Sequence, residues 1–326
     1  MREDLLNELE NEYAQLRAEN ERTEEMRKEK IRMEQPHIYE LTKERENIVF
    51  GTLRNIVNRT AAKADDLPER MKKLNEQIRT QLTENGYSAD YLAPVYRCPI
   101  CKDTGRTGDT IKEPCECLKK AYQNKIRKMI GLQSEKRESF STFDLNIFSN
   151  EKKDENDISQ RDLMKIIKED CEQWVELYPH NDNKDILVSG KSGLGKTFLL
   201  RAMAERLIER DVNVLIISAY KMLEILRKNY FDNNDSSTEL LDVEVLMIDD
   251  LGSEPMMQNI TIEQLFNLIN ERQNRNLSTI ISTNLTVDEI KVRYTERIAS
   301  RISDGRRCLV LSLIGKDIRT RGNLKA

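Results

Sequence analysis

A glycine-rich stretch from Gly190 to Thr197 carries the spacing G-x-x-x-x-G-K-T. Glycines at these positions let the backbone curl so that its N–H groups point at phosphate oxygens, and a following helix adds the positive end of its dipole. The terminal lysine and threonine supply a cation for the β and γ phosphates and a hydroxyl for magnesium. The stretch therefore predicts a site for ATP and Mg²⁺. The residues expected to contact the nucleotide are Gly190, Ser192, Gly193, Leu194, Gly195, Lys196, Thr197 and Phe198.

The sequence on either side of this stretch fits the setting that a phosphate-binding loop needs. The β-rich run DILVS precedes it, and the helical run FLLRAMAERLIER follows it. A match of this length also arises by chance in unrelated loops. The strand-loop-helix order disfavours that alternative, so we expect Lys196 to bind the phosphates and Thr197 to be a magnesium ligand.

A pair of carboxylates follows a second apolar run, VEVLMIDD. Ligands of a parallel sheet lie beyond the carboxyl ends of its strands, so acids at that end meet the phosphates. Asp249 is then the expected magnesium-side carboxylate, and Asp250 the group expected to polarise the attacking water. A carboxylate pair capping a helix or a turn is the alternative, which the upstream phosphate loop disfavours.

A further β-rich run, STIIST, is followed by Asn284, whose amide could contact the γ-phosphate or the attacking water. Asn is also a common turn residue, so that alternative stays open. A complete strand, VNVLIIS, lies between the phosphate loop and the acidic run. This order suits the P-loop ATPases with an additional strand better than the simple nucleotide kinases.

Four of the six cysteines cluster in a short segment at residues 98–117. Four thiolates can surround one Zn²⁺ tetrahedrally and leave no open position, so the predicted metal is structural. Chance clustering and a redox role are the alternatives, although a redox pair would need no second pair. Cys171 and Cys308 lie elsewhere and are expected to be core or incidental thiols. The predicted zinc ligands are Cys98, Cys101, Cys115 and Cys117.

The elements that must hold these groups alternate between strand and helix from about residue 161 onward, which indicates an α/β fold with a parallel sheet covered on both faces. Residues 149–157 are polar and charged without periodicity, as in a surface loop. We therefore expect a helical N-terminal domain with the zinc module over 1–135, a linker over 136–160 and an ATPase domain over 161–326.

The first 85 residues show thin apolar stripes at helical spacing on highly charged sequence. Such stripes suit either a small helical bundle or a face that docks on a partner. Charged residues make up 34% of the chain with a net charge of −4, which excludes a globally basic DNA-coating protein. There is no signal-peptide pattern and no long apolar run. The expected location is the cytoplasm, with no membrane association.

The motifs together resemble those of the DnaC/DnaI/IstB group of AAA+ ATPases. The similar segments are CPICKDTG, CECL, FSTFDLNIF, the phosphate loop, LMIDDLG, ISTN and ERIASRI, within residues 90–326. The resemblance implies an AAA+ core with a five-stranded parallel sheet after a helical, zinc-binding N-terminal domain. It also implies ATP-driven self-association, hydrolysis of ATP between subunits, and loading of a replicative DnaB-type helicase onto single-stranded DNA.

Several site residues are carried over from the resemblance alone. Asn284 matches the sensor-1 position, and ERIASRI matches the segment that gives an arginine finger to the adjacent subunit. Arg297 and Arg301 compete for that role, with Arg301 favoured; solvated arginines on an amphipathic helix are the alternative. Arg319 is a sensor-2-like candidate. The chain ends seven residues later, so we expect no C-terminal helical lid.

Two other functions fit parts of the sequence. One is an IstB-like transposition ATPase, which the cysteine cluster disfavours, and the other is a nucleotide-dependent scaffold that hydrolyses little ATP. For single-stranded DNA, the candidates lie on the helix after the second strand, and an ordinary amphipathic helix packed on the core explains the same residues equally well. These candidates are Tyr220, Lys221, Arg227 and Lys228.

Overall fold

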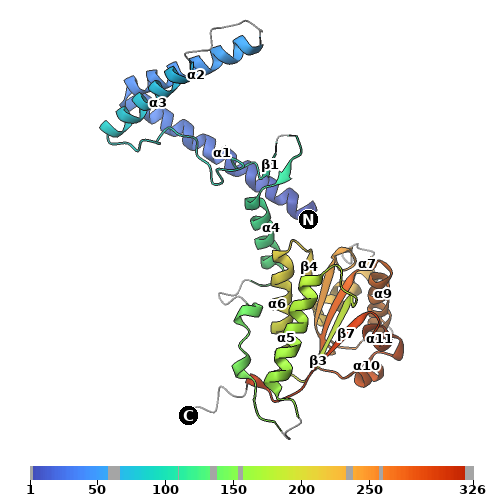
Figure 1. Ribbon diagram of the computed structural model, residues 1–326. Coiled ribbons are helices and arrows are strands. Elements are labelled where there is room, and N and C mark those ends of the chain that lie inside the picture. The colour runs from blue at the N-terminus through green and yellow to red at the C-terminus, as the bar shows by residue number, and fades with distance from the viewer. Residues whose placement is uncertain are drawn as a thin grey trace. The chain divides into compact units, whose positions relative to one another are not determined.

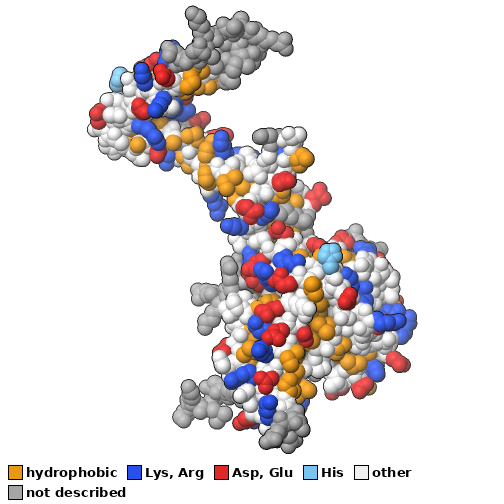
Figure 2. Space-filling model, in the orientation of Figure 1, with side chains coloured by type: hydrophobic (Ala, Val, Ile, Leu, Met, Phe, Trp, Pro, Cys, Tyr) orange, Lys and Arg blue, Asp and Glu red, His pale blue; other side chains and the backbone are white. Residues whose placement is uncertain are grey.

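The computed structural model (Figure 1) describes residues 3–57, 67–108, 110–132, 138–152, 157–232, 238–256 and 260–319. The chain divides into two compact units. One is Leu6–Lys119, and the other is Lys120–Ala326 together with Met1–Leu5. Among the described residues, no helix is both long enough and apolar enough to span a bilayer. Acidic and basic side chains are interspersed over the face in Figure 2, as the composition suggested.

The smaller unit is built on three helices: α1 (Glu3–Glu34), α2 (Pro36–Val57) and α3 (Leu67–Glu84). Pro36 opens α2 at the first helical position, where a missing N–H costs no hydrogen bond. Apolar residues of the three helices meet in a small core. Its buried members are Ile31, Ile38, Leu74, Ile78 and Leu82.

The cysteine segment follows α3 and ends in the first turn of α4 (Glu116–Met129), which contains Cys117. It contains a short antiparallel pair, β1 (Arg106–Thr107) and β2 (Glu113–Pro114). Lys102 and Asp103 adopt left-handed backbone conformations directly after the first cysteine pair, which turns the chain back toward that pair.

The larger unit contains the predicted five-stranded parallel sheet, and this prediction is confirmed. The strand order is β4-β5-β6-β3-β7, so the first strand of the sheet lies between the last two. The strands are short and β-branched, as expected for strands buried on both faces. Their bounds are β3 (Asp185–Gly190), β4 (Val214–Ser218), β5 (Val245–Leu251), β6 (Ser278–Thr283) and β7 (Cys308–Leu313).

Helices cover both faces of this sheet (Figure 1). On one face α6 (Lys196–Glu209) lies against the strands, and α5 (Gln160–Leu177) packs beside it. The opposite face carries α7 (Ala219–Asp232), α9 (Ile260–Asn274), α10 (Val287–Arg293) and α11 (Glu296–Ile302), and α8 (Thr238–Asp242) packs on α9. Thr286 and Glu289 form the capping box expected at the start of α10.

The segment expected to be a linker, residues 136–160, belongs to the larger compact unit, which begins at Lys120. It contains two short 3₁₀ turns, η1 (Phe140–Thr142) and η2 (Leu145–Ile147). Phe143 and Phe148 beside these turns are buried, because their rings pack on the phosphate loop and α6. The domain bounds expected at 135 and 161 stay a prediction, while the larger compact unit begins at Lys120.

Candidate functional site

The phosphate loop connects β3 to α6 and depends on left-handed glycines. Gly193 and Gly195 have φ angles of 75° and 92°, which residues with a side chain rarely adopt. A Cβ on Gly193 would also lie only 1.8 Å from a carboxylate oxygen of Asp317. Lys196 and Thr197 follow directly as the first residues of α6, so the helix N-terminus faces the loop.

A cleft of about 430 Å³ lies in front of this loop. Its lining brings together most of the predicted nucleotide-site residues from four separate parts of the chain. The predicted residues in it are Ser192, Gly193, Leu194, Gly195, Lys196, Thr197, Phe198, Asp249, Asp250, Asn284 and Arg319. Four further lining residues were not predicted: Glu138, Arg201, Ser282 and Ile318.

Lys196 lines the cleft and is only 7% exposed. Its Nζ donates to the carbonyl oxygens of Gly190 at 2.6 Å and Lys191 at 2.9 Å, and to Asn284 Oδ1 at 2.6 Å. Burial lowers the pKa of Lys196, while the carboxylates of Asp250 and Asp249 act in the opposite direction. A buried ammonium held by neutral oxygens is well placed to exchange them for anionic phosphate oxygens.

The two adjacent carboxylates of β5 point at different partners. The Thr197 hydroxyl donates to Asp249, with Oγ1 3.1 and 3.2 Å from the two carboxylate oxygens. Asp250 Oδ1 instead accepts from Asn284 Nδ2 at 2.7 Å. A hydroxyl beside a carboxylate is the oxygen donor set that suits Mg²⁺ in a phosphate site. These residues therefore fit a Mg²⁺ ion shared between Thr197 and Asp249.

The C-terminal segment 315–319 lies along the outer side of the phosphate loop. The backbone N–H of Ile318 donates to the Gly193 carbonyl at 3.0 Å, and Arg319 Nη1 lies 3.4 Å from Ser192 Oγ. The Gln160 side chain both donates to the carbonyl of Lys316 at 3.0 Å and accepts from its N–H at 3.2 Å. These contacts place Arg319 at the mouth of the cleft.

An aromatic cluster packs against the phosphate loop and the start of α6. Phe143 packs edge-on against Phe198, with ring centroids 5.2 Å apart, and stacks on Phe148 at 5.6 Å. Phe148 also lies 3.6 Å from the position that a Cβ of Gly195 would occupy. The segment FSTFDLNIF resembled the family but suggested no site residue, because its contacts with the loop join residues about fifty positions apart.

The comparisons with known proteins agree with this geometry. The family model described as "IstB-like ATP binding protein" matches residues 144–326, more than half of the chain. The chain belongs to this IstB-like ATP-binding family. The matched residues include the phosphate loop, Asp249, Asp250 and Asn284, which together line the cleft.

Individual relatives match shorter stretches of the chain. The chain is 30% identical over 114 residues to the replicative helicase loader DnaI of Bacillus subtilis, and the match covers 34% of this chain and 37% of DnaI. It is 30% identical over 138 residues to the replicative helicase loader DnaC of Buchnera aphidicola, covering 39% and 55%. The match thus spans about half or less of either relative. A crystal structure of the DnaC helicase loader aligns with a TM-score of 0.43 at 20% identity, over 54% of this chain and 98% of that one.

The two candidate arginine fingers of this family member lie outside the cleft of their own chain. The guanidinium groups of Arg297 and Arg301 on α11 lie over the ring of Phe266 on α9, at 4.5 and 4.4 Å from its centroid. Arg301 Nε also lies 3.4 Å from Asn270 Oδ1. The predicted shared helical face is therefore present, whereas Phe266 was not predicted because nothing in its local sequence marks it.

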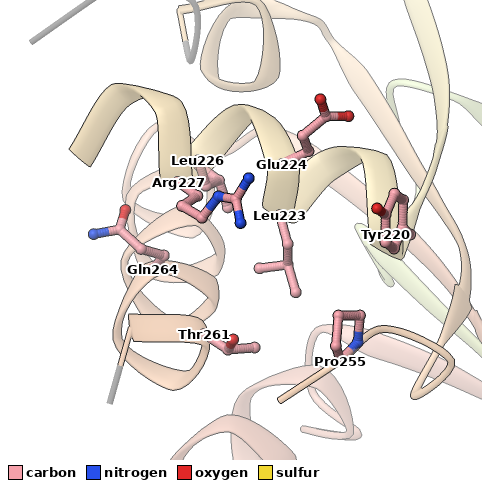
Figure 3. A pocket seen from close by; sticks show the side chains of 8 residues that line it. All are labelled: Tyr220, Leu223, Glu224, Leu226, Arg227, Pro255, Thr261 and Gln264. Atoms are coloured by element: carbon pink, nitrogen blue, oxygen red, sulfur yellow. The ribbon is translucent and has the colours of Figure 1, made fainter. Parts of the chain in front are cut away.

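A small pocket of about 80 Å³ lies between α7 and the start of α9 (Figure 3). Tyr220, which is 59% exposed, and Arg227 line it, while Met222 and Leu226 on the same helix are buried. Lys221 is paired with Glu224 at 2.9 Å, and the side chain of Lys228 lies outside the described residues. The other lining residues are Leu223, Glu224, Leu226, Pro255, Thr261 and Gln264.

The four clustered cysteines converge, with all four sulfur atoms within 4.8 Å of one another. The Sγ–Sγ distances are 3.9 Å for Cys98–Cys115 and 3.4 Å for Cys101–Cys117. A zinc ion with Zn–S bonds of about 2.3 Å needs sulfurs roughly 3.8 Å apart, so the donor set fits Zn²⁺. The pKa of Cys98 is lowered to about 7, mainly because the backbone N–H of Cys101 donates to its sulfur.

Asp103 ties this cluster to its surroundings and was not predicted. Its buried carboxylate accepts from the backbone N–H groups of Cys98 at 2.7 Å and Arg97 at 2.8 Å, and from Asn20 of α1 at 2.9 Å. A side chain therefore fixes the first cysteine turn, without any contribution from a metal. The left-handed φ of 58° at Asp103 allows its carboxylate to reach back across the turn.

Proposed function

We propose that this chain is an ATPase that loads a replicative DnaB-type hexameric helicase onto single-stranded DNA. The observation that carries the ATPase part is the cleft that joins the phosphate loop, Asp249, Asp250 and Asn284. The loader part is supported by the relatives named as replicative helicase loaders. The activity and partners of the whole chain are proposals, because the matched segments cover only 37% and 55% of those two relatives.

In the proposed reaction, Lys196 and the loop N–H groups hold the phosphates, and Mg²⁺ held by Thr197 and Asp249 would neutralise charge on them. Asp250 polarises the attacking water. Asn284 holds the Asp250 carboxylate and the Lys196 ammonium in fixed positions, since its side chain hydrogen-bonds to both. We propose that Arg301 or Arg297 of an adjacent subunit completes the site, because neither lines the cleft of its own chain.

The two other functions predict different behaviour. An IstB-like transposition ATPase agrees with the family match, which covers the ATP-binding part. The helical unit with its four cysteines is the feature that favours a loader, since the loader-like sequences that this chain resembles carry such a module. A scaffold that binds ATP but hydrolyses little of it would show binding without turnover.

Co-purification with the host replicative helicase tests the proposal. The tagged full chain is expected to retain the helicase hexamer from purified components, and ATP is expected to change the amount retained. A variant with charge reversed at the exposed Lys165 serves as a matched surface control. Failure to retain the helicase with or without ATP would refute the loader function. If the same protein still hydrolyses ATP normally, the ATPase part of the proposal is retained.

Removing two of the cysteines tests the metal assignment. The wild-type chain is expected to carry about one zinc per chain, and replacement of both Cys98 and Cys101 by Ser should release it. Helicase binding should be lost with the metal, because the cluster organises the smaller unit. ATP binding should be spared, because the nucleotide cleft lies in the larger unit.

Elemental analysis of freshly purified protein and binding of a fluorescent ATP analogue measure the two effects. Cys171→Ser is the control, since Cys171 is buried in α5 and takes no part in the cluster. Wild-type protein free of zinc would overturn the metal assignment.

The pocket on α7 is our proposed contact for single-stranded DNA. An exposed tyrosine can stack on a base, and Arg227 at the same pocket can bind a phosphate (Figure 3). We expect Tyr220→Ala combined with Arg227→Glu to weaken oligonucleotide binding at least about tenfold, since one stacked base and one phosphate contact are lost. Affinity should rise with a slowly hydrolysed ATP analogue, because assembly multiplies the contacts.

Fluorescence anisotropy with a labelled oligonucleotide at low and moderate salt measures this affinity. Lys165→Glu, an exposed charge reversal on α5, is the matched control. Equal binding by the double variant and the wild type would leave α7 as ordinary surface.

A further inference from the structure

The acidic strand β5 is irregular where its two carboxylates lie. Its pairing with β6 matches Ile248 with Ile281 but then Leu251 with Thr283, so β5 has one residue more than β6 over this stretch. Asp250 has a left-handed φ of 59°, which is uncommon for a residue with a side chain. The extra residue is a β-bulge next to the nucleotide cleft, a feature that re-aims side chains.

The hydroxyl of Ser282 on β6 hydrogen-bonds to β5 at the bulge, where the backbone pairing of β5 with β6 is interrupted. Its oxygen accepts from the backbone N–H of Asp250 at 2.8 Å and donates to Asp249 Oδ1 at 2.5 Å. Ser282 is 1% exposed, so water does not readily replace either bond. One hydroxyl therefore contacts both acidic residues, the first through its carboxylate and the second through its backbone.

This arrangement separates the directions of two side chains that are adjacent in sequence. Asp249 is held toward Thr197, and Asp250 is turned toward Asn284. On a regular strand, successive side chains point to opposite faces of the sheet. The bulge instead lets both carboxylates reach the same cleft from the end of one strand.

We propose that Ser282 is a positioning residue that sets the Mg²⁺-side carboxylate and the water-side carboxylate at the same time. In this role it acts through its hydrogen bonds to Asp249 and Asp250. The inference rests on the proposed ATPase function and extends it, because it assigns the division of labour between the two acids to a third residue.

The sharpest test compares Ser282→Thr with Ser282→Val, which have the same shape but differ in the hydroxyl. The Thr variant should retain most of the wild-type activity. The Val variant, like Ser282→Ala, should lose roughly ten- to a hundredfold in kcat, since positioning of two groups is disturbed. Ser278→Ala is the matched control, because Ser278 is equally buried on the same strand at its opposite end.

A binding measurement gives a readout that does not depend on turnover. Titration of a fluorescent ATP analogue with and without Mg²⁺ gives the increase in affinity that the metal provides. We expect this increase to shrink several-fold in Ser282→Val and to stay at the wild-type value in Ser282→Thr and Ser278→Ala, while affinity in EDTA is equal in all four proteins.

The possible failures are distinguishable. A Val variant with the wild-type Mg²⁺ effect and kcat would overturn the role of Ser282, as would equal losses in the Thr and Val variants. A wild-type chain that binds no ATP would instead overturn the proposed function itself. Thermal unfolding of each variant shows whether a loss of activity comes from a loss of folded protein. In that case the comparison of Ser282→Thr with Ser282→Val still decides, because the two side chains have the same shape.

Discussion

Lys196→Ala is expected to lose ATP binding almost completely. The ammonium is buried in the cleft beside the phosphate loop, so its removal leaves phosphate charge uncompensated where water is partly excluded. Truncating one partner of such a charge pair costs about 2–5 kcal/mol, or roughly thirty- to several-thousandfold in affinity. Equilibrium titration with a fluorescent ATP analogue in the presence of Mg²⁺ measures the loss.

The control for this variant is Lys165→Ala, which removes an exposed lysine from α5 of the same compact unit. Thermal unfolding should show that Lys196→Ala stays folded, because the carbonyl groups that lose its hydrogen bonds belong to the half-buried Gly190 and the exposed Lys191, where water can replace the ammonium. Wild-type affinity in Lys196→Ala would show that the nucleotide does not bind at this loop.

Asp250→Asn should keep ATP binding and lose turnover by about a hundred- to ten-thousandfold, the range typical of a group that polarises or deprotonates a nucleophile. Asn is suited to the left-handed backbone at this position, and its amide oxygen can still accept from Asn284 Nδ2. The substitution therefore removes the charge while it keeps the shape and the bulge. Phosphate release under saturating ATP measures the rate.

Asp182→Asn, at an exposed position ahead of β3, is the matched control for loss of one carboxylate charge. Both variants should bind the ATP analogue with wild-type affinity. Normal hydrolysis by Asp250→Asn would move the water-polarising role to another residue of the cleft.

Much of the core was predictable from sequence because its signals are local. The phosphate loop, its flanking strand and helix, and the acidic run each lie within a short segment, and the rule that ligands meet the carboxyl ends of parallel strands joins them. The five strands and the capping box at Thr286 also come from local patterns. The four-cysteine cluster was found for the same reason, since two close pairs are visible in one segment.

Two of the missed residues, Ser282 and Phe266, act through contacts between distant segments. Ser282 looks like an ordinary strand residue until the bulge in β5 places its hydroxyl between Asp249 and Asp250. Phe266 lies under both arginines of α11 only after α9 and α11 pack together. Periodicity indicates which face of an element is buried, but it does not indicate which neighbour lies there.

The sequence predicted where Arg297 and Arg301 lie on their helix, but not which of them acts on a nucleotide. Their spacing of four residues correctly placed both guanidinium groups on one face of α11, over one ring. Which of them reaches a neighbouring nucleotide depends on the interface between subunits. Both arginines therefore keep their places in the proposal.

Transfer of helicase onto DNA tests the proposed function most directly. Purified host replicative helicase is mixed with circular single-stranded DNA and ATP, with the full chain, without it, or with Lys196→Ala. The circles are then separated by gel filtration, and the helicase bound to them is quantified. We predict several-fold more helicase on the circles with the wild-type chain than in either control. Equal amounts in all three samples would contradict the assignment of this protein as a helicase loader.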